Sequence, residues 1–261
     1  MLKSLGKRTF LYGMLQRSRV RKAVRTWSPH DHEMAGFYSQ FVPAGGICFD
    51  VGANVGNRVK VFLKLGAKVV AIEPQRECQK VLASLFSAKA GFTLVPKAVG
   101  AEEGSAEIAI ADVSTVSSMS QEWIEKVQST GKFGEVQWSK KRVVPVTTLD
   151  LLIATHGVPD FIKIDVEGYE YQVIRGLSQP VKSLSLEFTP EFLDSTLECI
   201  EHLARLGDIR VNYALGETMA LSSKEWLSVP EGNRILEAFR DRQDVFGDVY
   251  VRFEPKTLSY Q

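Results

Sequence analysis

Apolar residues along the chain follow two different periods. Short runs rich in Val, Ile and Phe alternate with longer segments in which apolar positions recur every three or four residues. Runs of the first kind are typical of buried strands, and segments of the second kind are typical of amphipathic helices. The predicted strands are 47–51, 69–72, 93–95, 161–164, 184–188, 209–213 and 248–253. Because helical patterns separate most of them, we expect parallel βαβ units and therefore an α/β fold.

The helices of these units have recognisable first and last residues. One helix is expected over 54–65, with Gly66 placed to end it in a left-handed conformation. Pro74 suits the first turn of a second helix, and Pro190 opens a longer one. A further helix is expected from about Val166, directly after the fourth core strand. Crossover helices between parallel strands cover both faces of a sheet, so we expect helices on both sides.

The middle of the chain is less regular. Residues 106–110 alternate as in a half-buried strand, and residues 143–146 surround Pro145 as in an edge strand that pairs with it. Residues 111–141 between them are polar, with scattered aromatic side chains. Long loops without regular structure are uncommon in compact domains, so this insertion is interpreted as a lid or a substrate loop.

Residues 1–44 are interpreted as a basic N-terminal arm or cap, and residues 45–261 as the main domain. Residues 1–30 contain eight cationic side chains and no carboxylate. The apolar residues of this segment recur at helical spacing and begin with Phe10, Leu11, Met14 and Leu15. We expect the resulting helix to pack on the body of the protein, and peripheral contact with an anionic membrane is the alternative.

Charge and composition narrow the class of protein. After residue 30 the chain carries 24 basic and 31 acidic residues, and an acidic body disfavours nucleic acid as the main partner. The 261 residues are 44% hydrophobic, yet no apolar run reaches the roughly 18 residues of a membrane-spanning helix. The 3 cysteines are far apart, which suggests reduced thiols and a cytoplasmic location.

The strongest local motif is Asp50-Val51-Gly52-Ala53-Asn54-Val55-Gly56, where a strand passes into a helix. Gly52 allows a tight turn, and Gly56 allows close approach between helix, strand and ligand. Amides at the start of the helix suit a ligand that bears a carboxylate. Such glycines also occur for packing alone. Nicotinamide enzymes usually have a third glycine where this chain has Asn54, which disfavours an NAD-dependent oxidoreductase.

The second predicted strand ends at Glu73, which Pro74 follows. Glu73 comes 21 residues after Gly52, at a position from which a carboxylate can accept hydrogen bonds from both hydroxyls of a ribose. The alternative is an exposed glutamate at the start of a helix. Ala98 and Val99 follow the third strand, so the same topology places them next to an adenine.

Three carboxylates follow the fourth and fifth core strands. Asp165 and Glu167 come after residues 161–164, and Glu187 lies near the end of residues 184–188. Carboxylates at this edge of a parallel sheet can act as a general base or orient an acceptor. In the alternative interpretation, Asp165 only caps the following helix and Glu167 complements the helix dipole.

Three segments, 49–56, 146–150 and 163–170, resemble in this order the FkbM family of S-adenosylmethionine-dependent methyltransferases, most specifically at Asp165-Val166-Glu167-Gly168. The resemblance covers roughly residues 45–255 and excludes the arm. It implies a Rossmann-like class I methyltransferase fold, a mostly parallel sheet whose last strand is antiparallel, and action chiefly on hydroxyl groups. The expected cofactor-binding residues are Asp50, Gly52, Ala53, Asn54, Gly56, Glu73, Pro74, Ala98, Val99 and Asp165.

The sequence therefore predicts an O-methyltransferase that acts on a sugar, a glycan or a secondary metabolite. Asp165, Glu167 and Glu187 are its expected catalytic residues, and Asp165 also faces the cofactor. A Mg²⁺ ion held by these carboxylates is the less favoured alternative, so no metal site is expected. A noncatalytic cofactor-binding protein with the same fold is the second interpretation.

Overall fold

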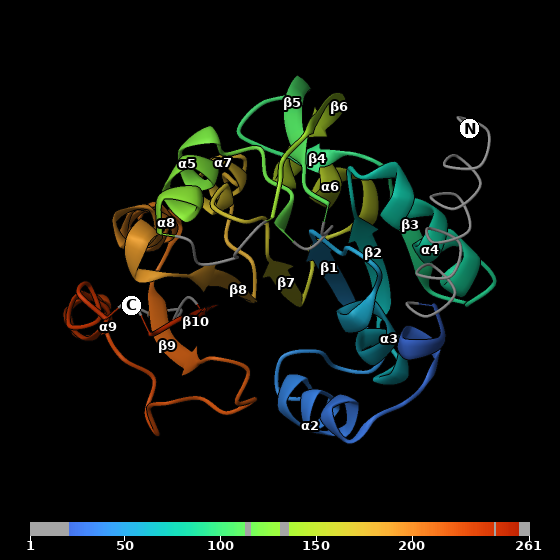
Figure 1. Cartoon of the computed structure of the whole chain (residues 1–261). Helices are drawn as coiled ribbons and strands as arrows, with labels where there is room; N and C mark the ends of the chain where they lie inside the picture. The colour runs from blue at the N-terminus through green and yellow to red at the C-terminus, as the bar shows by residue number, and fades with distance from the viewer. Residues whose placement is uncertain (1–20, 113–115, 131–135, 243, 256–261) are drawn as a thin grey trace.

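The computed structural model describes residues 21–112, 116–130, 136–242 and 244–255 (Figure 1). Its main sheet has the strand order β3-β2-β1-β7-β8-β10-β9. These strands are β1 (Ile47–Val51), β2 (Lys68–Ile72), β3 (Phe92–Val95), β7 (Phe161–Ile164), β8 (Ser183–Phe188), β9 (Ile209–Leu215) and β10 (Gly247–Phe253). Strands β3, β2, β1, β7 and β8 are parallel, whereas β10 is antiparallel to both β8 and β9. The expected α/β class, the mostly parallel sheet and the antiparallel last strand are confirmed.

Two layers of helices cover the two faces of this sheet (Figure 1). Successive side chains of a strand point to opposite faces, so Cys48 joins one buried core and Phe49 the other. The Cys48 side is covered by α2 (Pro29–Tyr38), α3 (Asn57–Lys64) and α4 (Arg76–Phe86). The Phe49 side is covered by α6 (Leu149–His156), α7 (Glu170–Arg175), α8 (Leu193–Leu206) and α9 (Val229–Glu237).

A smaller sheet has the strand order β4-β6-β5. Its strands are β4 (Ala98–Val99), β5 (Gly104–Ile110) and β6 (Lys140–Thr147); β5 and β6 pair as expected, and their pairing is antiparallel. The prediction of an edge strand around Pro145 was wrong, because β6 lies between the other two strands. Strand β4 pairs only with Val146 and Thr147, so the position of Pro145, which has no N–H group, falls outside that pairing.

The described part of the insertion 111–141 has a helix and a core of its own. Residues 121–130 form α5 (Gln121–Thr130), and Trp123 is buried in a cluster that includes Val116 and Ala111. The indole Nε1 of Trp138 donates a hydrogen bond to the backbone oxygen of Val116 at 2.7 Å. Trp123 and Trp138, two of the scattered aromatics, thus pack within the described part of the insertion, and its role as a lid or a substrate loop stays a prediction.

The described part of the N-terminal arm begins at residue 21. Val24 is buried, and α2 packs against α3. Asp31 caps the start of α2 together with Ser28 and forms an ion pair with Lys60 of α3 at 2.7 Å. The expected helix around Phe10, Leu11, Met14 and Leu15 lies outside the described residues. Among the helices of the described residues, none has the length and apolar character of a membrane-spanning segment.

Candidate active site

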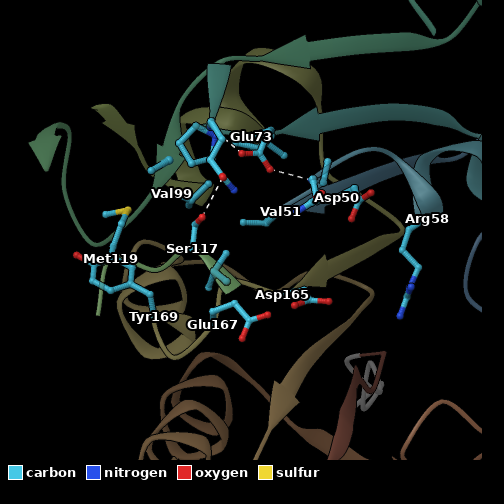
Figure 2. Close-up of a pocket in the computed structure, with 18 of the residues that line it drawn as sticks. Asp50, Val51, Arg58, Glu73, Val99, Ser117, Met119, Asp165, Glu167 and Tyr169 are labelled. Carbon is cyan, nitrogen blue, oxygen red and sulfur yellow. Dashed lines mark hydrogen bonds between the residues drawn. The ribbon is translucent and has the colours of Figure 1, made fainter. Parts of the chain in front are cut away.

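A cavity of about 290 Å³ lies at the carboxyl ends of β1, β2, β7 and β8 (Figure 2). This volume is close to the roughly 300–1,000 Å³ typical of small-molecule sites. After β1 the chain continues to β2 and β3 on one side of the sheet, and β7 and β8 extend it on the other, so the cavity lies where the strand order reverses. Gly52 and Glu73 both line it, as the sequence required.

The turn after β1 is built from backbone conformations that favour glycine. Gly52 and Gly56 have φ values of 85° and 93°, and Asn54 has a φ of 47°. The amides of Gly52 and Ala53 both donate to the backbone oxygen of Ile72, at 3.0 and 3.1 Å, which joins the turn to β2. These left-handed residues delay the helix, so α3 begins at Asn57 and not at Asn54 as expected.

Nine of the ten residues expected to contact the cofactor line this cavity, and Gly56 does not. A Cβ atom at position 56 would lie 2.5 Å from the Phe86 ring and 2.9 Å from Leu82 of α4. Gly56 therefore allows two helices to pack closely, which is the packing role that the sequence left open. The nine residues on the cavity wall are Asp50, Gly52, Ala53, Asn54, Glu73, Pro74, Ala98, Val99 and Asp165.

Glu73 is held at the end of β2 by its neighbours. Its side chain accepts hydrogen bonds from the amides of Asn54 at 2.8 Å and Gln75 at 2.7 Å, and the residue is 1% exposed. Burial raises the pKa of Glu73 to about 7, although these amides favour its charged form. The two amides fix the orientation of the carboxyl group on the cavity wall, which excludes the alternative of an exposed glutamate.

Asp50 is a second buried carboxyl group on the cavity wall. Within the described part of the chain, its Oδ2 atom has no hydrogen-bond partner. Burial raises the pKa of Asp50 to about 7, and Arg58 and Lys163 oppose this shift. A buried acceptor without a partner costs free energy, so an N–H donor from a ligand would stabilise it. Together with Glu73, it gives this end of the cavity two buried carboxyl groups that can accept hydrogen bonds from a ligand.

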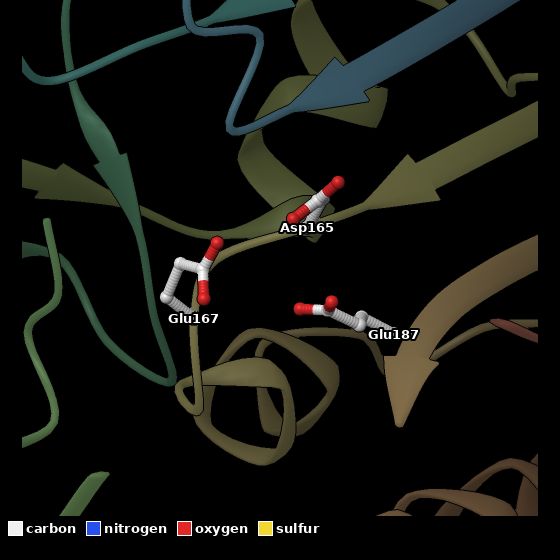
Figure 3. Close-up of side chains that lie close together, drawn as sticks. All are labelled: Asp165, Glu167 and Glu187. Carbon is white, nitrogen blue, oxygen red and sulfur yellow. The ribbon is translucent and has the colours of Figure 1, made fainter. Parts of the chain in front are cut away.

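The carboxyl groups of Asp165, Glu167 and Glu187 converge on the other end of the cavity (Figure 3). One oxygen atom from each lies within 4.8 Å of the others. Asp165 and Glu167 follow β7, and Glu187 comes from β8, so the meeting of adjacent strand ends was predicted correctly. This spacing would also allow the three carboxylates to hold one divalent cation.

The loop that carries Asp165 and Glu167 is not the start of a helix. Glu167 and Gly168 have φ values of 55° and 84°, and α7 begins at Glu170, four residues after the predicted start at Val166. Asp165 therefore does not cap α7. Glu170, the first residue of α7, holds this loop in place, because its buried carboxyl group accepts hydrogen bonds from the amides of Val166 at 3.1 Å and Gly168 at 3.3 Å.

Burial and mutual repulsion perturb the carboxyl groups at this end. Burial raises the pKa of Glu167 well above its ordinary value, and the charges of Glu187 and Asp165 add to the shift. The pKa of Glu187 is raised in the same way by burial and by Asp165. Carboxyl groups with raised pKa values in a cavity are typical of general acids and bases.

Several cavity residues were missed by the sequence reasoning. Arg58 of α3 faces the cavity and lies 3.7 Å from Glu217, which follows β9. The insertion contributes Ser117 and Met119, and Ser117 donates a hydrogen bond to the side chain of Gln75 at 3.0 Å. Arg58 lies inside the expected helix 54–65, next to the buried Val59. Its position in this helix did not indicate that its side chain lines a cavity. The other residues come from loops whose positions only the tertiary structure reveals.

Comparison with known proteins gave one family match. Residues 50–210 match the model of the methyltransferase FkbM domain. No curated protein matches the chain. This match includes Asp50, Glu73, Asp165 and Glu187, so both ends of the cavity lie within it.

Several solved structures of methyltransferases are similar to the chain at low sequence identity. A precorrin-6y C5,15-methyltransferase from Geobacter metallireducens is 13% identical, with 84% of this chain and 87% of that chain covered and a TM-score of 0.41. An O-methyltransferase from Bacillus cereus in complex with SAH is 10% identical, with 92% and 89% covered and a TM-score of 0.43. An S-adenosylmethionine-dependent O-methyltransferase from Thermotoga maritima is 12% identical, with 88% and 68% covered and a TM-score of 0.41.

The domain match spans well over half of the chain and agrees with the motifs in the turn after β1 and in the loop after β7. It confirms the expected family and, with it, S-adenosylmethionine as the cofactor. The chain belongs to the FkbM family of methyltransferases.

Proposed function

We propose that this protein transfers the methyl group of S-adenosylmethionine to a hydroxyl oxygen of a sugar, a glycan or a secondary metabolite. The observation that carries the proposal is the meeting of Asp165, Glu167 and Glu187 within 4.8 Å, in the cavity that Gly52 and Glu73 also line. A hydroxyl group must lose a proton when it is methylated, and carboxylates beside it can accept that proton. A cavity built only to bind the cofactor would not need three carboxyl groups at its far end.

The cofactor end of the cavity is assigned residue by residue. In our proposal Glu73 accepts hydrogen bonds from the ribose hydroxyls, and Oδ2 of Asp50, which has no hydrogen-bond partner among the described residues, accepts one from the ammonium group. The backbone of Gly52, Ala53 and Asn54 lies along the same wall. Pro74, Ala98 and Val99 line the cavity beyond Glu73, where an adenine ring would pack. When bound, S-adenosylmethionine supplies a methyl group on a positively charged sulfur.

The acceptor end is assigned from the carboxyl groups. We assign Asp165 to hold the acceptor hydroxyl in line with the methyl group, because orientation supplies much of the rate of such a transfer. A carboxylate oxygen of Glu167 or Glu187 then takes the hydroxyl proton. Their raised pKa values make these two groups stronger bases than exposed carboxylates. This assignment uses the residues of the chain alone, and Mg²⁺ bound by the same carboxylates is the alternative.

Binding and transfer test the proposal separately. Calorimetry should show binding of S-adenosylmethionine and none of NAD, and binding of NAD alone would contradict the assigned cofactor. An extract of the native host should then accept a labelled methyl group in the presence of the protein. Binding without transfer to any acceptor would favour the noncatalytic interpretation. Methyl ethers survive alkali and methyl esters do not, so alkali-labile product would contradict transfer to a hydroxyl group.

A chelator test decides between the two versions of the acceptor end. If the carboxylates act without a metal, EDTA treatment should leave the transfer rate unchanged. A rate that falls with EDTA and returns with Mg²⁺ would instead show that the three carboxylates hold a cation.

A further inference from the structure

Lys163 is a buried cation that lies directly behind the acceptor end of the cavity. It is in the middle of β7, and 1% of its side chain is exposed. Its Nζ atom donates hydrogen bonds to Asp248 Oδ1 at 2.9 Å and to the backbone oxygen of Ile164 at 3.3 Å, and lies 3.6 Å from Asp165 Oδ2. Two of the three donors of this ammonium group are therefore used in hydrogen bonds within the protein, and its charge is paired with two carboxylates.

Asp248 anchors this lysine on the side away from Asp165. It lies on β10, where it is paired in register with Glu187 of β8. Its Oδ2 atom accepts a hydrogen bond from the hydroxyl group of Tyr250 at 3.3 Å. Lys163 therefore reaches across β8 to a carboxylate whose own orientation is fixed.

Asp165 is held at two points. Its amide donates to the backbone oxygen of Val51 at 3.0 Å, which fixes the backbone against the end of β1. Its side chain is 38% exposed, so it faces both the cavity and the protein interior (Figure 2). Within the described residues, Lys163 is the ion-pair partner of its carboxylate. Without Lys163, the carboxylate would be free to rotate.

We propose that Lys163 is a positioning residue for methyl transfer: anchored by Asp248, it fixes the orientation in which the Asp165 carboxylate meets the acceptor. This inference rests on the proposed function, because that function gives Asp165 its contact with the acceptor. Residues that orient a functional group from behind affect the rate although they do not touch the ligand.

The surrounding charges agree with this role. Burial raises the pKa of Glu187, the charges of Asp165 and Glu170 raise it further, and Lys163 lowers it. The pKa of Lys163 is itself raised: burial lowers it, but Asp248 and Asp165 outweigh that effect. Lys163 is thus positively charged during methyl transfer. It interacts with the carboxyl groups of Asp165, Glu187 and Asp248, which lie on or directly after three neighbouring strands.

A double substitution separates positioning from a purely structural role. Lys163→Met alone leaves Asp248 buried without its partner, and such a change can unfold a protein. Lys163→Met combined with Asp248→Asn removes both charges and keeps both side chains close to their original size. Lys182→Met is the matched control, because Lys182 is 67% exposed and forms an ion pair with Asp160 at 3.2 Å on the surface.

Methyl transfer and cofactor binding are measured on all three variants and on the wild type. In the double variant, the transfer rate at saturating S-adenosylmethionine should fall by roughly ten- to hundredfold, as for other supporting partners. Its affinity for S-adenosylhomocysteine should change by less than about threefold, since the cofactor end is untouched. Lys182→Met should match the wild type in both. A folded double variant that transfers methyl at the wild-type rate would overturn the proposal.

A spectrum gives a reading that does not depend on turnover. Protein labelled with ¹³C at the aspartate carboxyl carbons and bound to S-adenosylhomocysteine should show one resonance that is lost in Asp165→Asn. That resonance should shift in the double variant and stay in place in Lys182→Met. An unchanged resonance would contradict the inference about Lys163, whereas a wild type that transfers no methyl group would contradict the proposed function.

Discussion

A side chain on residue 52 would occupy the position of the backbone oxygen of Asp165. Gly52 has a φ of 85°, and its missing Cβ atom is what lets the ends of β1 and β7 meet. The turn that lines the cofactor end and the carboxylate at the acceptor end are therefore fixed by one close contact between two backbones.

Gly52→Ala should destabilise the protein far more than Gly45→Ala. Both glycines have positive φ values, 85° and 77°, so both substitutions carry the cost of a left-handed alanine, about 1 kcal/mol. A Cβ atom at position 45 meets nothing within 4 Å, whereas one at position 52 meets the Asp165 backbone. Urea unfolding should show an additional loss of at least about 2 kcal/mol for Gly52→Ala. Equal losses in the two variants would contradict the close contact.

Glu73→Ala should weaken the binding of S-adenosylmethionine. Loss of the hydrogen bonds to the ribose hydroxyls is expected to raise the Kd by at least roughly ten- to a hundredfold, since even one bond to a charged group contributes about 1.5–3 kcal/mol. Glu102→Ala, which removes an exposed glutamate, is the control. Calorimetry on both variants checks this prediction. The assignment of Glu73 to the ribose would be wrong if the two variants bound the cofactor equally well.

Asp165→Asn should lower the rate of methyl transfer and leave cofactor binding nearly intact. The amide of asparagine keeps the size of the side chain but loses the negative charge. In our proposal this charge pairs with Lys163 and contacts the acceptor hydroxyl. A loss of turnover of roughly a hundredfold or more is expected for a group that contacts the reacting atoms. Asp241→Asn, at an exposed position, controls for the loss of one aspartate. Wild-type turnover in Asp165→Asn would remove this residue from the acceptor end.

The stability of the ligand-free protein should fall as the pH rises from about 4.5 to about 7. Burial raises the pKa of Asp50, Glu73 and Glu170 to about 7, so the folded protein binds these protons more tightly than the unfolded chain does. Their contribution to stability is complete below the unfolded pKa values and is lost as each group ionises in the folded state.

Glu73→Gln tests this pH dependence because a glutamine does not titrate. The variant should lose less stability than the wild type between pH 5 and 8 by an amount on the order of 2 kcal/mol, since each pKa unit corresponds to about 1.4 kcal/mol. Urea unfolding at several pH values measures the difference. Parallel curves for the two proteins would show that Glu73 does not titrate in this range.

The sequence predicted the core strands almost residue by residue, because each one is a short apolar run bounded by turn residues. Ile47–Val51 and Phe161–Ile164 have the expected bounds, and because these two strands pair in parallel, Asp50 and Asp165 lie at the same edge of the sheet. Helix starts were less accurate. Asn54 and Glu167 adopt left-handed conformations, which a sequence indicates mainly through glycine. For this reason α3 and α7 each begin several residues after the predicted start.

The remaining differences come from tertiary packing. The spacing of Gly56 indicated a close approach but did not reveal that α4 is the element it packs against. Nothing in the sequence indicated that Trp123 packs against Gly168. A side chain at position 168 would collide with the indole of Trp123. The contact of Lys163 with Asp248 joins residues 85 positions apart, and neither periodicity nor motif spacing predicts such a pair.

The ion pair of Lys163 and Asp248 limits how this protein can be shortened or recombined. Lys163 lies within residues 50–210, the part that matches the family, whereas Asp248 lies beyond it. A fragment that ended at residue 210 would keep the lysine and Asp165 but lose Asp248, the closer of its two counter-charges. A chimera that joined this chain to the C-terminal strands of a relative would need a carboxylate able to reach the same ammonium group, so these two segments should be exchanged together.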